Sequence, residues 1–62
     1  MKKAIRVGDV VEETGTDSGL WVVAEVFPVT RTSPAFSRVT LRGRPDVVAY
    51  VNNDRLQHAT VR

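Results

Sequence analysis

The sequence predicts an all-β domain of five short strands, with a single 3₁₀ turn before the last strand. Twelve of the 62 residues are valine, whose branched side chain favours extended backbone. Groups of glycine, proline, asparagine, aspartate and serine divide the chain into segments of strand length. No segment of useful length repeats its apolar residues with a helical period, so helices are not expected.

We expect strands at residues 7–13, 20–27, 37–42, 47–51 and 57–61, with a turn at 43–46 and the 3₁₀ turn at 52–56. In the second strand, alternation puts Leu20, Val22, Ala24 and Val26 toward the core, and Trp21, Val23, Glu25 and Phe27 on the opposite face. In the third strand, Val39 and Leu41 are predicted to point inward. Leu56 is predicted to close one end of the core.

The length fits one domain, residues 1–62, and a domain this small buries only about 60% of its unfolded surface. Cysteine is absent, which excludes disulfides and thiolate metal sites. We therefore expect either a well-packed barrel or a homo-oligomer. No apolar run matches a signal peptide or a membrane span, so the sequence predicts a cytoplasmic protein without a membrane partner.

Charge is distributed unevenly along the chain. Residues 1–25 carry three basic and five acidic side chains, a sum of −2, whereas residues 26–45 carry four arginines and no acid, a sum of +4. Such asymmetry indicates either a binding face or charge pairing between strands of one sheet. The sequence leaves both interpretations open.

The segment Val7-Gly8-Asp9-Val10-Val11, the strand spacing and the turn at residues 52–56 together resemble the SH3-like barrel class, which includes KOW-type and Tudor-like domains. The resemblance covers nearly the whole chain and implies a five-stranded barrel with a 3₁₀ turn before the last strand. Many unrelated functions occur on this barrel, so it implies no particular activity.

The same opening segment is similar to that of the type II, plasmid-borne dihydrofolate reductases, which assemble as tetramers around a central pore. Residues 47–50 align with the Val-Gln-Ile-Tyr pore motif of that family, with matches at Val47 and Tyr50. Val48 and Ala49 stand in place of the glutamine and isoleucine. This resemblance implies, as the alternative function, a tetrameric pore-type reductase with Tyr50 at the pore.

Residues suited to catalysis do not form a recognisable set. His58 is the sole histidine, and its neighbours offer no arrangement for acid–base chemistry. Among the acidic residues of the first strand, Asp9 and Glu13 share a face while Glu12 points the other way, so they do not converge on a cation. A glycine-rich phosphate loop is also missing. We therefore predict no catalytic residue, metal ligand or cofactor.

Arginine and aromatic side chains are the best candidates for binding. The predicted set consists of Trp21, Arg31, Arg38, Arg42, Arg44 and Tyr50, together with Phe27 and Phe36. Arginine combined with exposed aromatic rings is typical of sites for single-stranded nucleic acid and of protein interfaces. The position of Trp21 stays open, since it is either exposed or closes the second side of the core. Phe36 is expected to cap the core rather than to contact a ligand.

The function predicted from these observations is a small non-catalytic interaction module that binds through the outer face of the second and third strands and the loop at residues 29–36. A protein partner is favoured over nucleic acid because the net charge of +2 is small, and binding to nucleic acid scales with the phosphates that a protein neutralises. The size and simplicity of the chain suggest an accessory protein of a phage or another mobile element.

Overall fold

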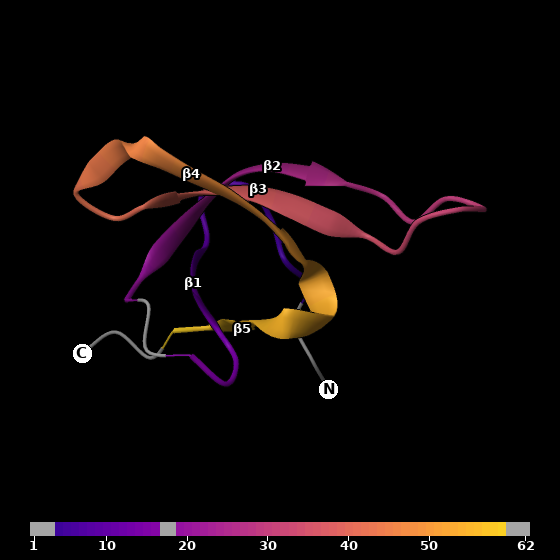
Figure 1. Ribbon diagram of the computed structural model, residues 1–62, viewed down its shortest axis with the longest axis horizontal. Coiled ribbons are helices and arrows are strands. Elements are labelled where there is room, and N and C mark those ends of the chain that lie inside the picture. Colours follow the sequence, from indigo (N-terminus) through magenta and orange to yellow (C-terminus); the bar gives the residue numbers. More distant parts are fainter. Residues whose placement is uncertain (1–3, 17–18, 60–62) are drawn as a thin grey trace.

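The structure is a computed structural model that describes residues 4–16 and 19–59. Its elements follow one another as β1 (Val10–Glu13), β2 (Trp21–Phe27), β3 (Phe36–Leu41), β4 (Arg44–Asn52), the 3₁₀ helix η1 (Asn53–Arg55) and β5 (Leu56–His58) (Figure 1). The fold is therefore all-β with a 3₁₀ turn immediately before the last strand, as the sequence predicts.

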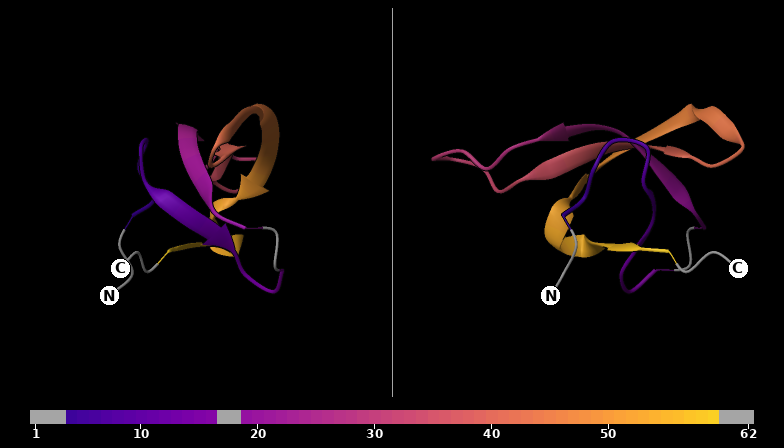
Figure 2. Two further views of the ribbon diagram at one scale, coloured as in Figure 1. Left: turned by 90° about the vertical axis from the view of Figure 1, so that its left-hand side faces the viewer. Right: turned by 180° about the vertical axis from the view of Figure 1, so that it is seen from behind.

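The strands form one antiparallel sheet with the order β4-β3-β2-β1-β5. The sheet curls, so that β2, β3 and β4 form an upper layer while β5 lies below them, with β1 connecting the two levels (Figures 1 and 2). The sheet does not close, and β4 and β5 are its two edge strands.

The core lies on the concave side of this curled sheet. Its buried apolar residues are Val11, Val23, Val39 and Leu56, and the half-buried Ile5, Trp21, Val26, Ala49 and Val51 pack against them. The prediction that Leu56 closes the core is confirmed, because its side chain is only 7% exposed. Valine supplies most of this core, which matches the β-branched composition of the chain.

The predicted faces of β2 are wrong for Trp21 and Val23. Val23, predicted to point outward, is 1% exposed, and Trp21 packs against the core. The reason is a β-bulge: Val23 pairs with Val39 and Glu25 pairs with Arg38, which leaves Ala24 as the extra residue. The bulge shifts the alternation by one position, so that Val26 also faces the core although it is three residues after Val23.

The start of β1 also differs from the prediction. Val7 and Gly8 form a turn, and the strand begins only at Val10. Gly8 has a φ of +92°, and the backbone N–H of Asp9 donates to the carbonyl of Arg6 at 3.1 Å. The Oδ2 of Asp9 accepts a further hydrogen bond from the backbone N–H of Arg6 at 3.0 Å. The aspartate thus holds a turn where the sequence predicts extended chain.

The β3–β4 connection is tighter than the predicted turn at 43–46. Arg42 and Gly43 alone connect the paired residues Leu41 and Arg44, and Gly43 has a φ of +85°. Pro45 is therefore inside β4, which it can occupy because β4 is an edge strand. The last strand ends at His58, and residues 60–61 of its predicted range lie outside the described part of the chain.

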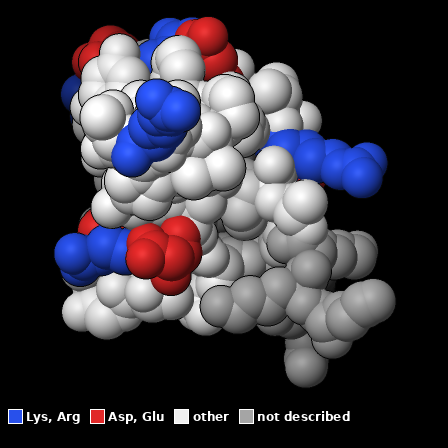
Figure 3. Space-filling view, turned by 90° about the vertical axis from the view of Figure 1, so that its right-hand side faces the viewer, with Lys and Arg blue, Asp and Glu red and all other residues white. Residues whose placement is uncertain are grey.

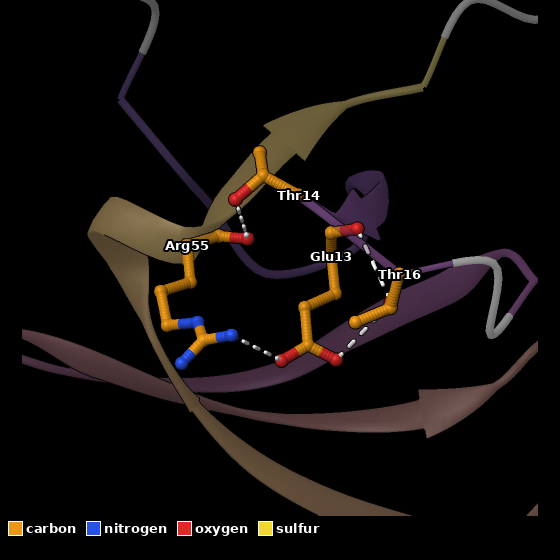
Figure 4. Close-up of polar contacts among 4 residues, drawn as sticks. All are labelled: Glu13, Thr14, Thr16 and Arg55. Atoms are coloured by element: carbon orange, nitrogen blue, oxygen red, sulfur yellow. Dashed lines mark hydrogen bonds and ion pairs between the residues drawn. The ribbon is translucent and has the colours of Figure 1, made fainter.

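Polar contacts fasten η1 to the end of β1 (Figure 4). The backbone N–H and the hydroxyl of Thr14 donate to the carbonyl of Arg55 at 2.8 and 3.2 Å. The Arg55 guanidinium lies 3.8 Å from Oε2 of Glu13, and the hydroxyl of Thr16 reaches the same glutamate. The contact between Thr14 and Arg55 joins residues 41 positions apart, and it holds η1, and with it the start of β5, against the end of β1.

Candidate functional site

The face of the sheet that points away from the core carries most of the exposed apolar side chains of β2, β3 and β4. Because Ser37 and Val39 are fully buried, alternation directs their neighbours in β3 to the opposite side. Cross-strand pairing then defines the outer face, which consists of Val22, Glu25, Phe27, Phe36, Arg38, Thr40, Val48, Tyr50 and Asn52.

Three aromatic rings lie together at one end of this outer face. The rings of Phe27 and Phe36 stack with centroids 4.7 Å apart and planes 16° from parallel. The ring of Tyr50 lies 6.5 Å from that of Phe36, tilted by 57°. Both phenylalanines are half-buried, and Tyr50 is 65% exposed. The prediction that Phe36 caps the core is therefore wrong. Phe36 belongs to an aromatic cluster on the surface.

One ion pair lies beside this aromatic cluster. Arg38 occupies the centre of the outer face, opposite both Glu25 and Tyr50 in the ladder. Its Nη2 lies 3.4 Å from Oε1 of Glu25, and both side chains are partly exposed. A surface pair of this kind contributes little to stability, about 0–1 kcal/mol, but it neutralises the charge of Arg38 on the face.

The structure does not gather the remaining predicted arginines around Arg38. Arg31 is in the exposed loop between β2 and β3, which extends far from the sheet at the right of Figure 1. Arg42 and Arg44 lie at the β3–β4 turn, and Arg44 pairs with Asp46 at 3.5 Å. On the side of the molecule in Figure 3, basic side chains stand at separate places, some with acidic atoms beside them. The predicted arginine set is thus dispersed.

Of the predicted binding residues, Arg38 and Tyr50 are brought together, with facing positions across β3 and β4. Trp21 is half-buried and packs against the core, so the second of its two interpretations holds. Phe27 and Phe36 accompany the arginines in the set predicted from the sequence, whereas Val48 does not belong to that set. The signal in the sequence was a phenylalanine at the end of one strand, Phe27, and another at the start of the next, Phe36, with Tyr50 on the strand after that.

A second polar feature lies at the start of β1. The Nε2 of His58 is 2.9 Å from Oδ2 of Asp9, and both side chains are about one-third exposed. The hydrogen bond from His58 is the main cause that lowers the pKa of Asp9, followed by the hydrogen bond from the backbone N–H of Arg6. This contact fastens β5 to the turn before β1.

Two open hollows adjoin the contact between Asp9 and His58. The smaller, about 450 Å³, is lined by Ala4, Arg6, Asp9 and His58. The larger, about 710 Å³, is lined by Ala4, Ile5, Thr14, Val26, Asn53, Asp54, Leu56, Gln57 and His58. Within residues 4–16 and 19–59, no group of three or more histidine, cysteine or acidic side chains is arranged to hold a metal ion. A single histidine–aspartate contact in an open hollow defines no specific chemistry.

Comparison of the chain with models of protein families gave no match, and neither curated proteins nor solved structures gave one. In the part of the chain that the structure describes, no helix is both long and apolar enough to cross a membrane. The candidate site therefore rests on its geometry alone.

Proposed function

We propose that the chain is an SH3-like barrel that serves as a non-catalytic module and binds a protein partner through the outer face of β2, β3 and β4. The observation that carries the proposal is the aromatic cluster of Phe27, Phe36 and Tyr50 on that face, away from the core. Exposed aromatic rings on a small domain are typical of the centre of a protein interface.

Charge favours protein over nucleic acid as the partner. On the outer face, the guanidinium of Arg38 is paired with Glu25, so the face carries no net charge. The other predicted arginines lie elsewhere, and one is paired with Asp46. Binding of single-stranded nucleic acid requires a basic groove beside the stacking rings. A neutral aromatic face suits an apolar peptide or protein surface instead.

The strand order and the 3₁₀ turn support the SH3-like assignment. The resemblance depends on residues 7–11, the strand spacing and the turn at residues 52–56, and the curled five-stranded sheet with η1 before β5 is compatible with it. The barrel class does not itself select a partner. The other reading of such a small domain is a purely structural role as a subunit of a larger assembly, and the aromatic cluster on the outer face favours the binding module over it.

The experiment is a quantitative affinity capture with three forms of the immobilised protein. The test variant carries Tyr50→Ser and Arg38→Gln, which remove the exposed ring and the central guanidinium. The control variant carries Val29→Ser, because Val29 is 71% exposed in the loop outside the outer face. We expect at least one protein that the unchanged chain and the control capture equally and that the test variant captures about tenfold less.

Three results would contradict the proposal. Capture of the same proteins by all three forms would remove the outer face as the site. Tight, salt-sensitive binding of a single-stranded oligonucleotide, lost in the test variant, would assign the face to nucleic acid. A tetramer that binds a reduced cofactor would instead support the pore-type reductase, the alternative that the resemblance at Val47 and Tyr50 implies.

A further inference from the structure

The strand β4 is a long edge with an uncharged central segment. It runs for nine residues, and among the described residues no strand lies along its other side (Figures 1 and 2). Arg44, Pro45 and Asp46 protect its beginning, since charge and proline discourage pairing between edges. The segment Val47–Val51 contains no charge, no proline and no glycine. Edge segments of this composition tend to pair with another strand.

The direction of the backbone groups along β4 follows from the hydrogen bonds at its end. The N–H of Asn53 donates to the carbonyl of Ala35 at 2.9 Å, so the backbone groups of Asn53 point toward β3. Asn53 and Ala35 continue the register in which Val51 pairs with Ser37. Backbone groups alternate in direction along an antiparallel strand, so those of Val51 and Ala49 also point toward β3. The groups of Val48, Tyr50 and Asn52 therefore point to the free edge.

We propose that this edge pairs with the same edge of a second copy of the chain, antiparallel and centred on Ala49. In that register, Val48 of one copy meets Tyr50 of the other, and this pairing occurs twice across the two-fold axis. Both residues direct their N–H and C=O groups outward, so the two pairs form hydrogen-bonded pairs, with Ala49 facing Ala49 as a non-hydrogen-bonded pair.

Side chains fit the same arrangement. Val48 is 46% exposed and Tyr50 is 65% exposed, and an aromatic ring opposite a β-branched residue is a favourable cross-strand pair. Two residues beyond Val48 and Tyr50 on the same face, Asp46 of one copy meets Asn52 of the other, so like charges do not face each other. A closed two-fold pair uses the same surface on both copies, which satisfies both edges and stops further growth.

The pairing goes beyond the proposed binding function, because it sets two outer faces side by side in one continuous sheet. It predicts a bivalent module, in which the linked faces bind a partner with repeated sites more tightly than one face does. Tyr50 belongs to both surfaces, so the self-association test changes Val48 instead, which lies outside the aromatic cluster, and it measures mass in solution rather than capture of a partner.

The test is sedimentation equilibrium of the whole chain over a concentration series up to about 1 mM, the range for weak contacts. We expect a monomer–dimer equilibrium and no larger species. Val48→Pro removes one outward N–H in each copy, and Val48→Lys adds a charge at the edge. Each should weaken the dimer by about tenfold or more.

Thr40→Lys is the matched control. Thr40 pairs with Val48 on the same outer face but belongs to the central strand β3, so this substitution should leave the dimer unchanged. Amide spectra of each variant establish that it is folded. A chain that stays monomeric throughout the series would overturn the proposal. Equal loss of the dimer with Thr40→Lys, or no loss with either Val48 variant, would do the same.

A cross-link tests the register. The chain has no cysteine, and Ala49→Cys places a thiol on each copy at the two-fold axis. Opposed residues of a non-hydrogen-bonded pair lie about 4.5 Å apart between Cα atoms, within the range for a disulfide. We expect rapid oxidation to a covalent dimer, and slow oxidation with Thr40→Cys. Equal rates for the two variants would contradict the pairing centred on Ala49.

Discussion

The rings of Phe27 and Phe36 stack 4.7 Å apart across the last pair of the β2–β3 ladder, on the outside of the sheet. Phenylalanines at the end of one strand and the start of the next would ordinarily be expected to close a core. Here they form a surface on which Tyr50 extends the aromatic area toward the edge strand. Their position is the basis of the proposed binding face.

Replacement of Phe27 should destabilise the fold moderately. Phe27→Ala removes the stacked ring pair, which is worth about 0.5–1.5 kcal/mol, together with part of the half-buried apolar area. We expect the free energy of unfolding in urea to fall by about 1–2 kcal/mol. Val29→Ala, in the exposed loop, should change it by less than about 0.5 kcal/mol. Equal effects would show that the ring pair contributes nothing.

Replacement of Tyr50 should separate binding from stability. Tyr50 is 65% exposed, so Tyr50→Ser should alter the free energy of unfolding by less than about 1 kcal/mol. Capture of the partner should nevertheless fall strongly, because exposed aromatic residues contribute much of the energy of interfaces. Urea unfolding and capture are measured on the same preparation. A variant that unfolds easily and still captures the partner would contradict both statements.

The buried hydroxyl of Ser37 should matter more than its size suggests. It is fully buried and donates a hydrogen bond to Oδ1 of Asn53 at 2.5 Å, which connects β3 to the 3₁₀ helix η1. Ser37→Ala leaves that amide oxygen without its donor and should lower the free energy of unfolding by about 1–3 kcal/mol. Thr32→Ala, in the exposed loop, is the control. If Ser37→Ala lowered the free energy of unfolding no more than Thr32→Ala does, the role of the contact would be refuted.

Stability should fall in acid because of Asp9. The contacts with His58 and Arg6 lower the folded-state pKa of Asp9 below its ordinary value of 3.8. The unfolded chain therefore binds the proton more readily, so this contribution is present above pH 3.8 and is lost as the pH falls through the folded-state pKa. Asp9→Asn should make unfolding less dependent on pH below that value. If the midpoint of thermal unfolding of Asp9→Asn fell with decreasing pH as steeply as that of the unchanged chain, this role would be contradicted.

Much of the fold could be predicted from the sequence, because β-branched composition and turn residues act locally. The five strands, η1 and the inward direction of Val39 and Leu56 follow from such local rules. The exposure of Trp21 and Val23 was not predictable in the same way. The bulge at Ala24 depends on pairing with β3, and no residue type in β2 marks where the extra residue falls.

The candidate site was predicted less completely than the fold. Arg38 and Tyr50 are paired across β3 and β4, but Arg31 belongs to the connection between β2 and β3, and Arg44 begins β4 beside the turn. Charge summed along a segment cannot say which side chains meet, because neighbouring positions in a strand point to opposite faces. The stacked phenylalanines became visible only with the register of β2 on β3.

The most direct test of the binding face is the dissociation constant of a captured protein, measured by calorimetry with the purified partner. The account predicts that Tyr50→Ser combined with Arg38→Gln weakens binding by about tenfold or more, while Val29→Ser leaves it unchanged. Equal dissociation constants for all three forms would contradict the outer face of β2, β3 and β4 as the site of binding.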